Sequence, residues 1–283
     1  MANSNSISIY AFPIIQMFKK GAAVLATALA VYFLIDSRLS QRADSYSVIN
    51  NALYDSIDWW AESGPVSLLG KMNTVRVAYF LRYLPKGRIL DVGCGGGFVS
   101  EALAGAGFQM TGVDMSTASI AAAAAHAKSG NLKIDYVVAD AMHLPFGDST
   151  FDGVVISDVL EHLTDLNRAV SEIFRVLRPG GVVVFDTINR TPFSYLCIYI
   201  VAQELLGILP KNAHDPHLFI KPAELSLILE SVGFETNPST WTGISPVFDP
   251  ITFFQTLRVD KLISGFWENR FDLSGSYQGW ARK

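Results

Sequence analysis

A glycine cluster between two carboxylates is the part of this chain best suited to hold a cofactor. Residues 88–92 form a mostly apolar run that contains Asp91, residues 93–97 contain four glycines, and a second apolar run ends in Asp114. Glycine lets the backbone approach a ligand closely, and a carboxylate at the end of the next strand can accept both hydroxyls of a ribose. The pattern predicts a nucleoside-type cofactor, although tight strand-to-helix turns also need glycine for structural reasons.

A second group of reactive side chains follows a later apolar run. Asp158, Glu161 and His162 stand directly after residues 151–157. Side chains three and four residues apart share a helix face, so the three could converge on one divalent cation or on one substrate hydroxyl. His162, together with Glu161, could then act as a general base, and a cation could lower the pKa of the hydroxyl. Alternatively, the group caps the turn or only contacts the substrate.

The elements that would position both groups are the strands of a parallel sheet. Apolar runs alternate with helical segments, which is the pattern of an α/β protein. The runs are residues 88–92, 110–114, 136–139, 151–157 and 182–185. The carboxyl ends of parallel strands share one edge, so the residues that follow them should line a common crevice. Residues 276–282 are expected to form a last, antiparallel strand in a sheet of seven strands.

The spacing of the glycines indicates which nucleoside cofactor to expect. A dinucleotide site has the pattern Gly-x-Gly-x-x-Gly, whereas these glycines are bunched and followed by Phe98. Asp91 would repel a pyrophosphate but could hold a charged amino-acid moiety. The pattern resembles the first motif of the Rossmann-like, class I S-adenosylmethionine-dependent methyltransferases. That resemblance implies that Asp140, beside Ala141, lies near the adenine amino group, a role compatible with capping a helix.

Several separated motifs between residues 45 and 243 resemble the ubiquinone-pathway O-methyltransferases that act on polyprenylated hydroxyphenols. The motifs are residues 54–60, Asn73 with Arg76, the glycine cluster, and residues 158–162, 189–190, 210–215 and 219–225. We therefore predict that S-adenosylmethionine is bound by Arg76, Asp91, Gly93, Cys94, Gly95, Asp114, Met115, Asp140, Ala141 and Ser157. Glu161 and His162 are the predicted catalytic residues. The predicted ligands of a divalent cation, such as magnesium, are Asp158, Glu161 and His162.

Two features depart from that family. Where the family has the first of the glutamates that could bind a metal, this chain has Asp158, whose side chain is one methylene shorter. Residues 247–271 are longer and more aromatic than the family's usual ending. Relatives of the family also methylate carbon on prenyl diphosphates, so the resemblance leaves the acceptor atom open. Tyr54, Trp59 and Trp60 could stabilise the carbocation that such a reaction produces.

Composition and charge fit one such domain with additions. Of the 283 residues 50% are hydrophobic and 17% charged, which points to contact with a membrane. The net charge of −4 gives no reason to expect a nucleic-acid partner. The two cysteines, Cys94 and Cys197, lie in a cofactor turn and an apolar segment, so a reducing compartment is expected rather than a disulfide framework.

An uncharged stretch near the N-terminus stands apart from the matched region. Residues 21–35 carry no charge and are flanked by Lys19, Lys20 and Asp36. The stretch is shorter than the roughly 20 residues that a helix needs to cross a bilayer. Three interpretations remain: a membrane anchor or interfacial helix, a helix packed over the catalytic domain, and a cleaved signal peptide. We expect an apolar segment at residues 1–44 and a methyltransferase domain at residues 45–283.

A second apolar stretch interrupts the domain as a predicted lid insertion at about residues 189–220. Residues 193–209 would make a helix of about 25 Å, flanked by Arg190 and Lys211. Packing in the core is the simplest interpretation. The resemblance implies instead an interfacial segment through which an isoprenoid-tailed acceptor passes from lipid to the active site, with the basic flanks among headgroups.

The remaining histidines are weaker candidates. His126 and His143 are expected to be structural or solvated, and His214 and His217 mark the entrance to a helix that opens at Pro222. The resemblance implies that His214 is a lid hinge or a substrate contact.

The leading functional expectation is S-adenosylmethionine-dependent O-methylation of a polyprenylated hydroxyphenol or catechol. Its partners would be a hydrophobic, isoprenoid-bearing small molecule and a membrane surface, with the catalytic domain on the cytoplasmic side. The alternatives are C-methylation of a prenyl diphosphate and a non-catalytic membrane scaffold. Retention of Asp91, Asp114 and Asp140 argues against the scaffold.

Overall fold

The computed structural model of the protein describes residues 30–37, 51–61, 66–256, 258 and 261–283. The chain forms two compact units, residues 1–41 and residues 42–283. The predicted boundary after residue 44 lies outside the described residues, as does most of the predicted apolar helix at residues 21–35. Within the first unit, residues 30–37 are helical. Among the described helices, none combines the length and the hydropathy that a membrane crossing requires.

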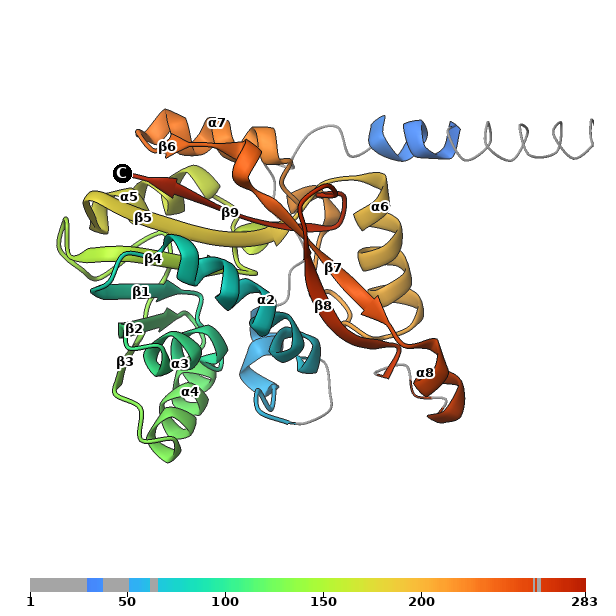
Figure 1. Ribbon diagram of the computed structural model, residues 1–283, viewed down its shortest axis with the longest axis horizontal. Helices are drawn as coiled ribbons and strands as arrows, with labels where there is room; N and C mark the ends of the chain where they lie inside the picture. Colours follow the sequence, from blue (N-terminus) through green and yellow to red (C-terminus); the bar gives the residue numbers. More distant parts are fainter. Residues whose placement is uncertain (1–29, 38–50, 62–65, 257, 259–260) are drawn as a thin grey trace, which may run out of the picture. The chain divides into compact units, whose positions relative to one another are not determined.

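The second unit is built on one mixed sheet (Figure 1). Its strands are β1 (Arg88–Val92), β2 (Gln109–Asp114), β3 (Ile134–Val138), β4 (Phe151–Ser157), β5 (Leu177–Ile188), β6 (Glu235–Thr236), β7 (Thr242–Phe248), β8 (Ile263–Asn269) and β9 (Ser276–Arg282). They lie in the order β3-β2-β1-β4-β5-β9-β7-β8, with β6 paired to β9. The first five strands are parallel, and β9 runs antiparallel to β5, as predicted for residues 276–282.

The sheet has nine strands among the described residues, not the predicted seven. The additional strands come from the aromatic C-terminal region. β7 pairs antiparallel with both β9 and β8, and helix α8 (Pro250–Thr256) connects β7 to β8. We will refer to β7, α8 and β8 as the C-terminal hairpin.

Helices cover both faces of the parallel strands. The longer ones are α2 (Ser67–Tyr83), α3 (Phe98–Gly105), α4 (Thr117–Ser129), α5 (Leu166–Val176) and α7 (Pro222–Val232). The shorter helical segments are η1 (Asn51–Ser56), η2 (Leu160–His162), α6 (Pro192–Ser194), η3 (Tyr195–Leu205), η4 (Pro216–Leu218) and η5 (Pro238–Thr240).

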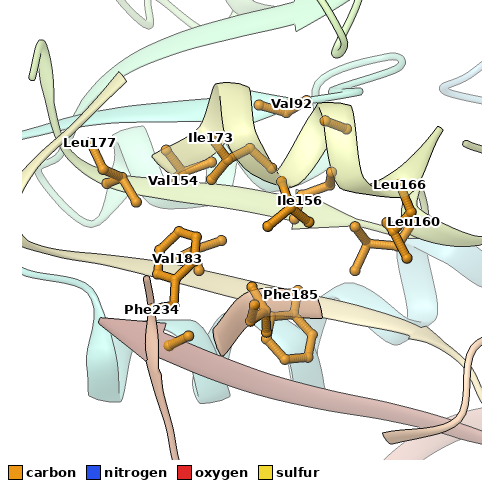
Figure 2. Packing of buried hydrophobic residues seen from close by; sticks show 14 of the residues in the cluster. Val92, Val154, Ile156, Leu160, Leu166, Ile173, Leu177, Val183, Phe185 and Phe234 are labelled. Atoms are coloured by element: carbon orange, nitrogen blue, oxygen red, sulfur yellow. The ribbon is translucent and has the colours of Figure 1, made fainter. Parts of the chain in front are cut away.

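Two hydrophobic cores lie on opposite faces of the sheet because successive strand residues point to opposite sides. Leu90 and Val154 belong to the core shared with α5 and α7, where Ile173 and Phe234 also pack (Figure 2). Their neighbours Ile89 and Val155 belong to the other core, together with residues of α2 and α3. Burying one such side chain contributes roughly 1.5–3 kcal/mol. The sheet is therefore fixed from both sides, and its carboxyl edge is a rigid base for a site.

The predicted lid forms a shorter helix than expected. α6 opens with a capping box at Thr191 and continues into η3, a π-helix, and Gly207 follows in a left-handed conformation. A glycine in that conformation commonly ends a helix. Arg190 is fully buried and binds the Phe219 carbonyl and Glu224, so the prediction that it lies among lipid headgroups is wrong.

Candidate active site

The glycine turn after β1 is held by the carboxylates on either side of it. Asp91 is buried and accepts a hydrogen bond of 2.6 Å from the Ser100 hydroxyl. Asp114 accepts hydrogen bonds of 2.9 Å from the backbone N–H groups of Gly95 and Ser116, one on each oxygen. A carboxylate has about four lone-pair sites, so Asp114 can still accept two hydroxyls. Burial raises the pKa of Asp91 to about 6 and raises that of Asp114 as well.

An aromatic segment closes over this turn. A Cβ atom on Gly95 or Gly96 would lie 2.5 or 2.4 Å from the Trp59 ring, so only glycine permits that approach. The Trp59 indole donates to Ser119 and the Trp60 indole donates to the Gly96 carbonyl. These two tryptophans therefore cover the glycine turn. This structural role is separate from the predicted role of stabilising a carbocation.

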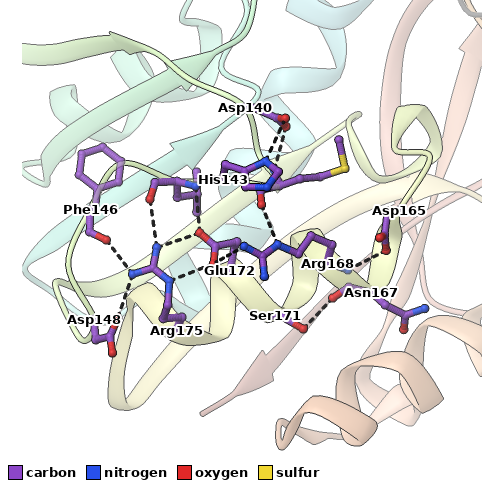
Figure 3. Close-up of polar contacts among 12 residues, drawn as sticks. Asp140, His143, Phe146, Asp148, Asp165, Asn167, Arg168, Ser171, Glu172 and Arg175 are labelled. Carbon is purple, nitrogen blue, oxygen red and sulfur yellow. Dashed lines mark hydrogen bonds and ion pairs between the residues drawn. The ribbon is translucent and has the colours of Figure 1, made fainter.

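The loop after β3 is fixed by polar contacts with α5 (Figure 3). Asp140 accepts from the Met142 N–H at 2.8 Å, and Arg168 donates to the Met142 carbonyl at 3.0 Å. Glu172 and Arg175 bind backbone groups of Leu144 and other residues further along the loop. Asp140 therefore caps a turn, and this network places Asp140 and Ala141 on the wall of the cavity described below.

Arg76 and two acids form a buried group beside the cofactor turn. The Arg76 guanidinium lies 2.6 Å from Asp158 and 3.5 Å from Asp186. Burial works to raise the pKa of Asp158, but the charge of Arg76, the hydrogen bonds with Asp186 and Arg76 and the proximity of His214 together outweigh burial and leave that pKa below its usual value. Burial raises the pKa of Asp186 to about 8. Arg76 and Asp158, predicted to bind cofactor and metal respectively, are thus engaged with one another.

A different trio comes together at the predicted catalytic position. Glu161, His162 and His214 each present a ligand atom, and the three atoms lie within 4.8 Å of one another. Glu161 accepts from the Thr187 hydroxyl at 2.7 Å, while its other oxygen and Nδ1 of His162 are buried without a hydrogen-bond partner. Asp158 stands outside this cluster, and His214 takes the third position. We refer to these three residues as the histidine cluster.

The electrostatics of the histidine cluster follow from burial. Burial, then the proximity of His214, lowers the pKa of His162 to about 3. Burial also lowers the pKa of His214 to about 4. Burial, then repulsion from Asp158, raises the pKa of Glu161 to about 8. Both imidazoles are consequently neutral at physiological pH, and each has a lone pair that can bind a cation or accept a hydrogen bond.

Gln203 of the lid determines which nitrogen of His214 is free. The Gln203 side-chain oxygen accepts from the His214 backbone N–H at 3.0 Å, which fixes the orientation of the amide. The same oxygen lies 3.3 Å from Nδ1 of His214, so Nδ1 must carry the proton. The lone pair of His214 is therefore on Nε2, in keeping with the rule that a hydrogen bond at one ring nitrogen sets the state of the other.

The three side chains of the histidine cluster indicate which kind of cation could bind there. Two imidazoles and one carboxylate suit zinc, manganese or iron, whereas magnesium prefers oxygen ligands. The unpartnered atoms of Glu161 and His162 fit a role as ligands. The geometry thus fits a divalent cation that accepts nitrogen, with His214 in the place predicted for Asp158.

One cavity of about 770 Å³ joins these groups. Its cofactor half is lined by the predicted residues Arg76, Asp91, Gly93, Cys94, Gly95, Asp114, Met115, Asp140, Ala141 and Ser157. His162 and His214 also line the cavity, whereas Glu161, whose ligand atom lies within 4.8 Å of theirs, does not. Its other half lies among side chains of η3 and the C-terminal hairpin.

The sequence prediction missed three members of this site. Asp186 and Thr187 end the apolar run of β5, so the rule that identified Asp114 could have found them. Gln203 and its hydrogen bond to His214 could not be predicted from the sequence, because a single glutamine in an apolar stretch has no characteristic spacing.

Comparisons with known proteins agree with this geometry. A family model described as "Methyltransferase domain" matches residues 90–185. A ubiquinone biosynthesis O-methyltransferase of Coxiella burnetii is 40% identical over 207 residues, which cover 72% of this chain and 88% of the relative. The enzyme of the same name from Rickettsia akari is 35% identical over 188 residues, covering 64% of this chain and 74% of the relative.

Solved structures share the fold at lower identity. A SAM-dependent methyltransferase from Thermotoga maritima aligns with a TM-score of 0.53 and 20% identity, covering 75% of this chain and 88% of its own. A structure from work on conversion of a disulfide bond into a thioacetal group during echinomycin biosynthesis aligns with a TM-score of 0.61 and 22% identity, covering 82% and 90%. At these identities the likeness concerns the fold alone.

Proposed function

Because the chain belongs to the family of ubiquinone biosynthesis O-methyltransferases, we propose that it methylates a phenolic hydroxyl of an isoprenoid-tailed catechol or hydroxyphenol. S-Adenosylmethionine is the methyl donor. The observation that supports the acceptor most strongly is the cavity, because Asp114, the two histidines of the histidine cluster and the uncharged residues of η3 and the C-terminal hairpin all line it. A polar reacting group and an apolar tail would each find a matching environment.

Methyl transfer from a sulfonium is a direct displacement, so the enzyme must align the acceptor oxygen, the methyl group and the sulfur. Asp114 would hold the ribose and Asp91 the amino-acid end of the donor, which would fix the position of the sulfonium. Trp59, which is buried against the glycine turn, excludes water from this side. Exclusion of water also strengthens the electrostatic interactions within the site.

The acceptor hydroxyl must lose its proton during the reaction. A phenol in water has a pKa near 10, so a base accelerates the transfer at neutral pH. The neutral imidazoles of His162 and His214 supply that base within the cavity. Alternatively, Glu161, His162 and His214 would hold a divalent cation through the same lone pairs, and that cation would take the place of the base by lowering the pKa of the hydroxyl.

The cavity lining disfavours a prenyl diphosphate as acceptor. A diphosphate needs several basic side chains, yet Arg76 is the only arginine or lysine among the described lining residues. Arg76 is already paired with Asp158 and Asp186. The lining therefore supports a neutral phenol rather than a polyanion.

Membrane association on the cytoplasmic side forms the remaining part of the proposal. Leu196 and Leu205 on the lid expose about half or more of their side-chain surface, as does Phe193. Apolar side chains exposed together on one element suit insertion among lipid acyl chains. An isoprenoid-tailed acceptor would reach the cavity from such a surface.

The experiment that tests the acceptor offers methyl-labelled S-adenosylmethionine to the full chain with two separate pools, a prenylated catechol and a prenyl diphosphate. We expect label in the catechol pool only, and loss of that transfer after chelation if a cation is required. Transfer to the diphosphate pool alone would contradict the proposal. A His143→Ala variant is a matched control, because His143 lies on the surface and outside the cavity.

A further inference from the structure

The C-terminal hairpin lies beyond the predicted antiparallel strand and forms one wall of the cavity. Pro246 of β7 pairs with Phe266 of β8, and Ser245 pairs with Trp267, so each pair shares a face of the sheet and the two consecutive pairs lie on opposite faces. All four residues line the cavity. Opposite them, the lid contributes Cys197, Ile198, Val201 and Ala202.

The hairpin is tied to the helix that carries Arg76. The Lys71 ammonium donates to the Ile263 carbonyl at 2.6 Å, and Arg82 lies 2.5 Å from Glu268. Both basic residues belong to α2 and both partners to β8. The wall is thus held in place relative to the catalytic half of the cavity.

The chemistry of this half of the cavity is that of a hydrocarbon site. Among the described lining residues from β7, β8 and η3, none is charged, and Ser245 is the only one with a hydroxyl. Beyond the lining, the hairpin exposes Ile251 and Phe254, each by about 70% of its surface. The cavity that contains His162 and His214 therefore has an uncharged wall made by the lid and the hairpin, and the hairpin exposes further apolar side chains outside that wall.

We propose that the C-terminal hairpin is a specificity element that binds the isoprenoid tail, with Phe266 and Trp267 as its principal contacts. This inference rests on the proposed function, because the tail belongs to the acceptor whose hydroxyl is methylated. The occupant follows from continuity: one cavity is lined both by His162 and His214 and by uncharged residues of η3 and β8, so a molecule that reacts at the histidines can extend an apolar tail along that uncharged wall. Only a long, uncharged chain matches that lining.

The test compares catechols that carry no tail, one isoprene unit or several units. Phe266→Ser and Trp267→Ser should lower kcat/KM for the long-tailed catechol about tenfold and leave kcat/KM for the tailless one unchanged. Ser245→Phe, which fills the cavity opposite Trp267, should act in the same direction. Phe271→Ser is the matched control, because Phe271 is 98% exposed and outside the lining, and should change none of the three values.

The outcomes separate this inference from the proposed function. Equal losses for all three catechols, or no loss for any, would overturn the role of the hairpin while methylation of catechols by the unaltered chain still stands. If the unaltered chain methylates no catechol, the proposed function itself fails. Affinity for S-adenosylmethionine, measured on each variant, shows that the cofactor half has kept its fold. Trp267 is half exposed, which makes its substitution well tolerated.

Discussion

At the scale of single residues, burial decides the chemistry of the site. His162, His214 and Glu161 are ordinary ionisable groups whose pKa values move because they are enclosed, and Asp158 is kept ionised by Arg76. The sequence placed Asp158 next to Glu161 and His162, but spacing alone could not show that Arg76, 82 residues earlier, would bind it. The third position of the cluster is consequently filled from the lid.

Asp114 should be the principal polar contact of the cofactor ribose. Replacing it by Ala removes charge-assisted hydrogen bonds worth about 1.5–3 kcal/mol, so the affinity for S-adenosylmethionine should fall by roughly tenfold to a hundredfold. Titration calorimetry measures this directly. Asp135→Asn on the neighbouring strand is a control, since Asp135 is exposed. Unchanged affinity in Asp114→Ala would remove the ribose assignment.

His162 should act on the acceptor proton. His162→Ala should lower kcat by about a hundredfold or more at neutral pH and leave cofactor affinity intact. Because the pKa of His162 is lowered to about 3, the imidazole is neutral from pH 5 upward and its own titration adds no slope there. The loss should shrink as the pH approaches 10 and the phenol ionises by itself. A pH–rate profile checks this, and full activity of the variant at pH 7 would exclude the base role.

At the scale of elements, the parallel strands could be predicted from the sequence, whereas the C-terminal hairpin could not. Apolar runs ending in Asp114 and Ser157 identified strands of the parallel sheet, because buried strands are continuous hydrophobic runs. β7 and β8 were not predicted as strands. β7 depends on pairing with β9 and β8 on pairing with β7, and no local sequence pattern encodes such contacts. The same holds for Gln203, whose partner lies on the far side of a loop.

The lid should support catalysis through Gln203. Gln203→Leu removes the acceptor that orients His214, so kcat should fall about tenfold or more while KM for S-adenosylmethionine stays the same. Gln203→Glu keeps an oxygen that can accept from His214 and should restore most of the activity. Steady-state kinetics of both variants provide the measurement. If Leu and Glu at this position behave alike, the hydrogen bond to His214 has no positioning role.

At the scale of the whole molecule, the chain consists of two compact units. Residues 42–283 hold every described residue of the site, and the unit of residues 1–41 contains a helix at residues 30–37. We expect the chain without residues 1–41 to fold and to bind S-adenosylmethionine. It should also bind less to anionic lipid vesicles, because it loses one apolar segment and keeps only the exposed apolar side chains of residues 42–283, those of the lid among them.

Vesicle co-sedimentation tests both parts of that expectation. In the truncated chain, Leu205→Glu should reduce the remaining binding further, whereas Leu227→Glu on α7, an equally exposed leucine, should not. If neither the full nor the truncated chain sediments with vesicles, the proposed association with a membrane is wrong.

We expect the cavity to direct the methyl group of S-adenosylmethionine to an oxygen of an isoprenoid-tailed phenol. The most direct measurement uses S-adenosylmethionine with a ¹³C-labelled methyl group and locates the label in the product by NMR spectroscopy. We predict a single labelled methyl group on the ring oxygen of the tailed catechol, formed about a hundredfold more slowly when His162→Ala replaces the unaltered chain at neutral pH. A labelled methyl group on a carbon atom of the ring or of the tail would contradict the account.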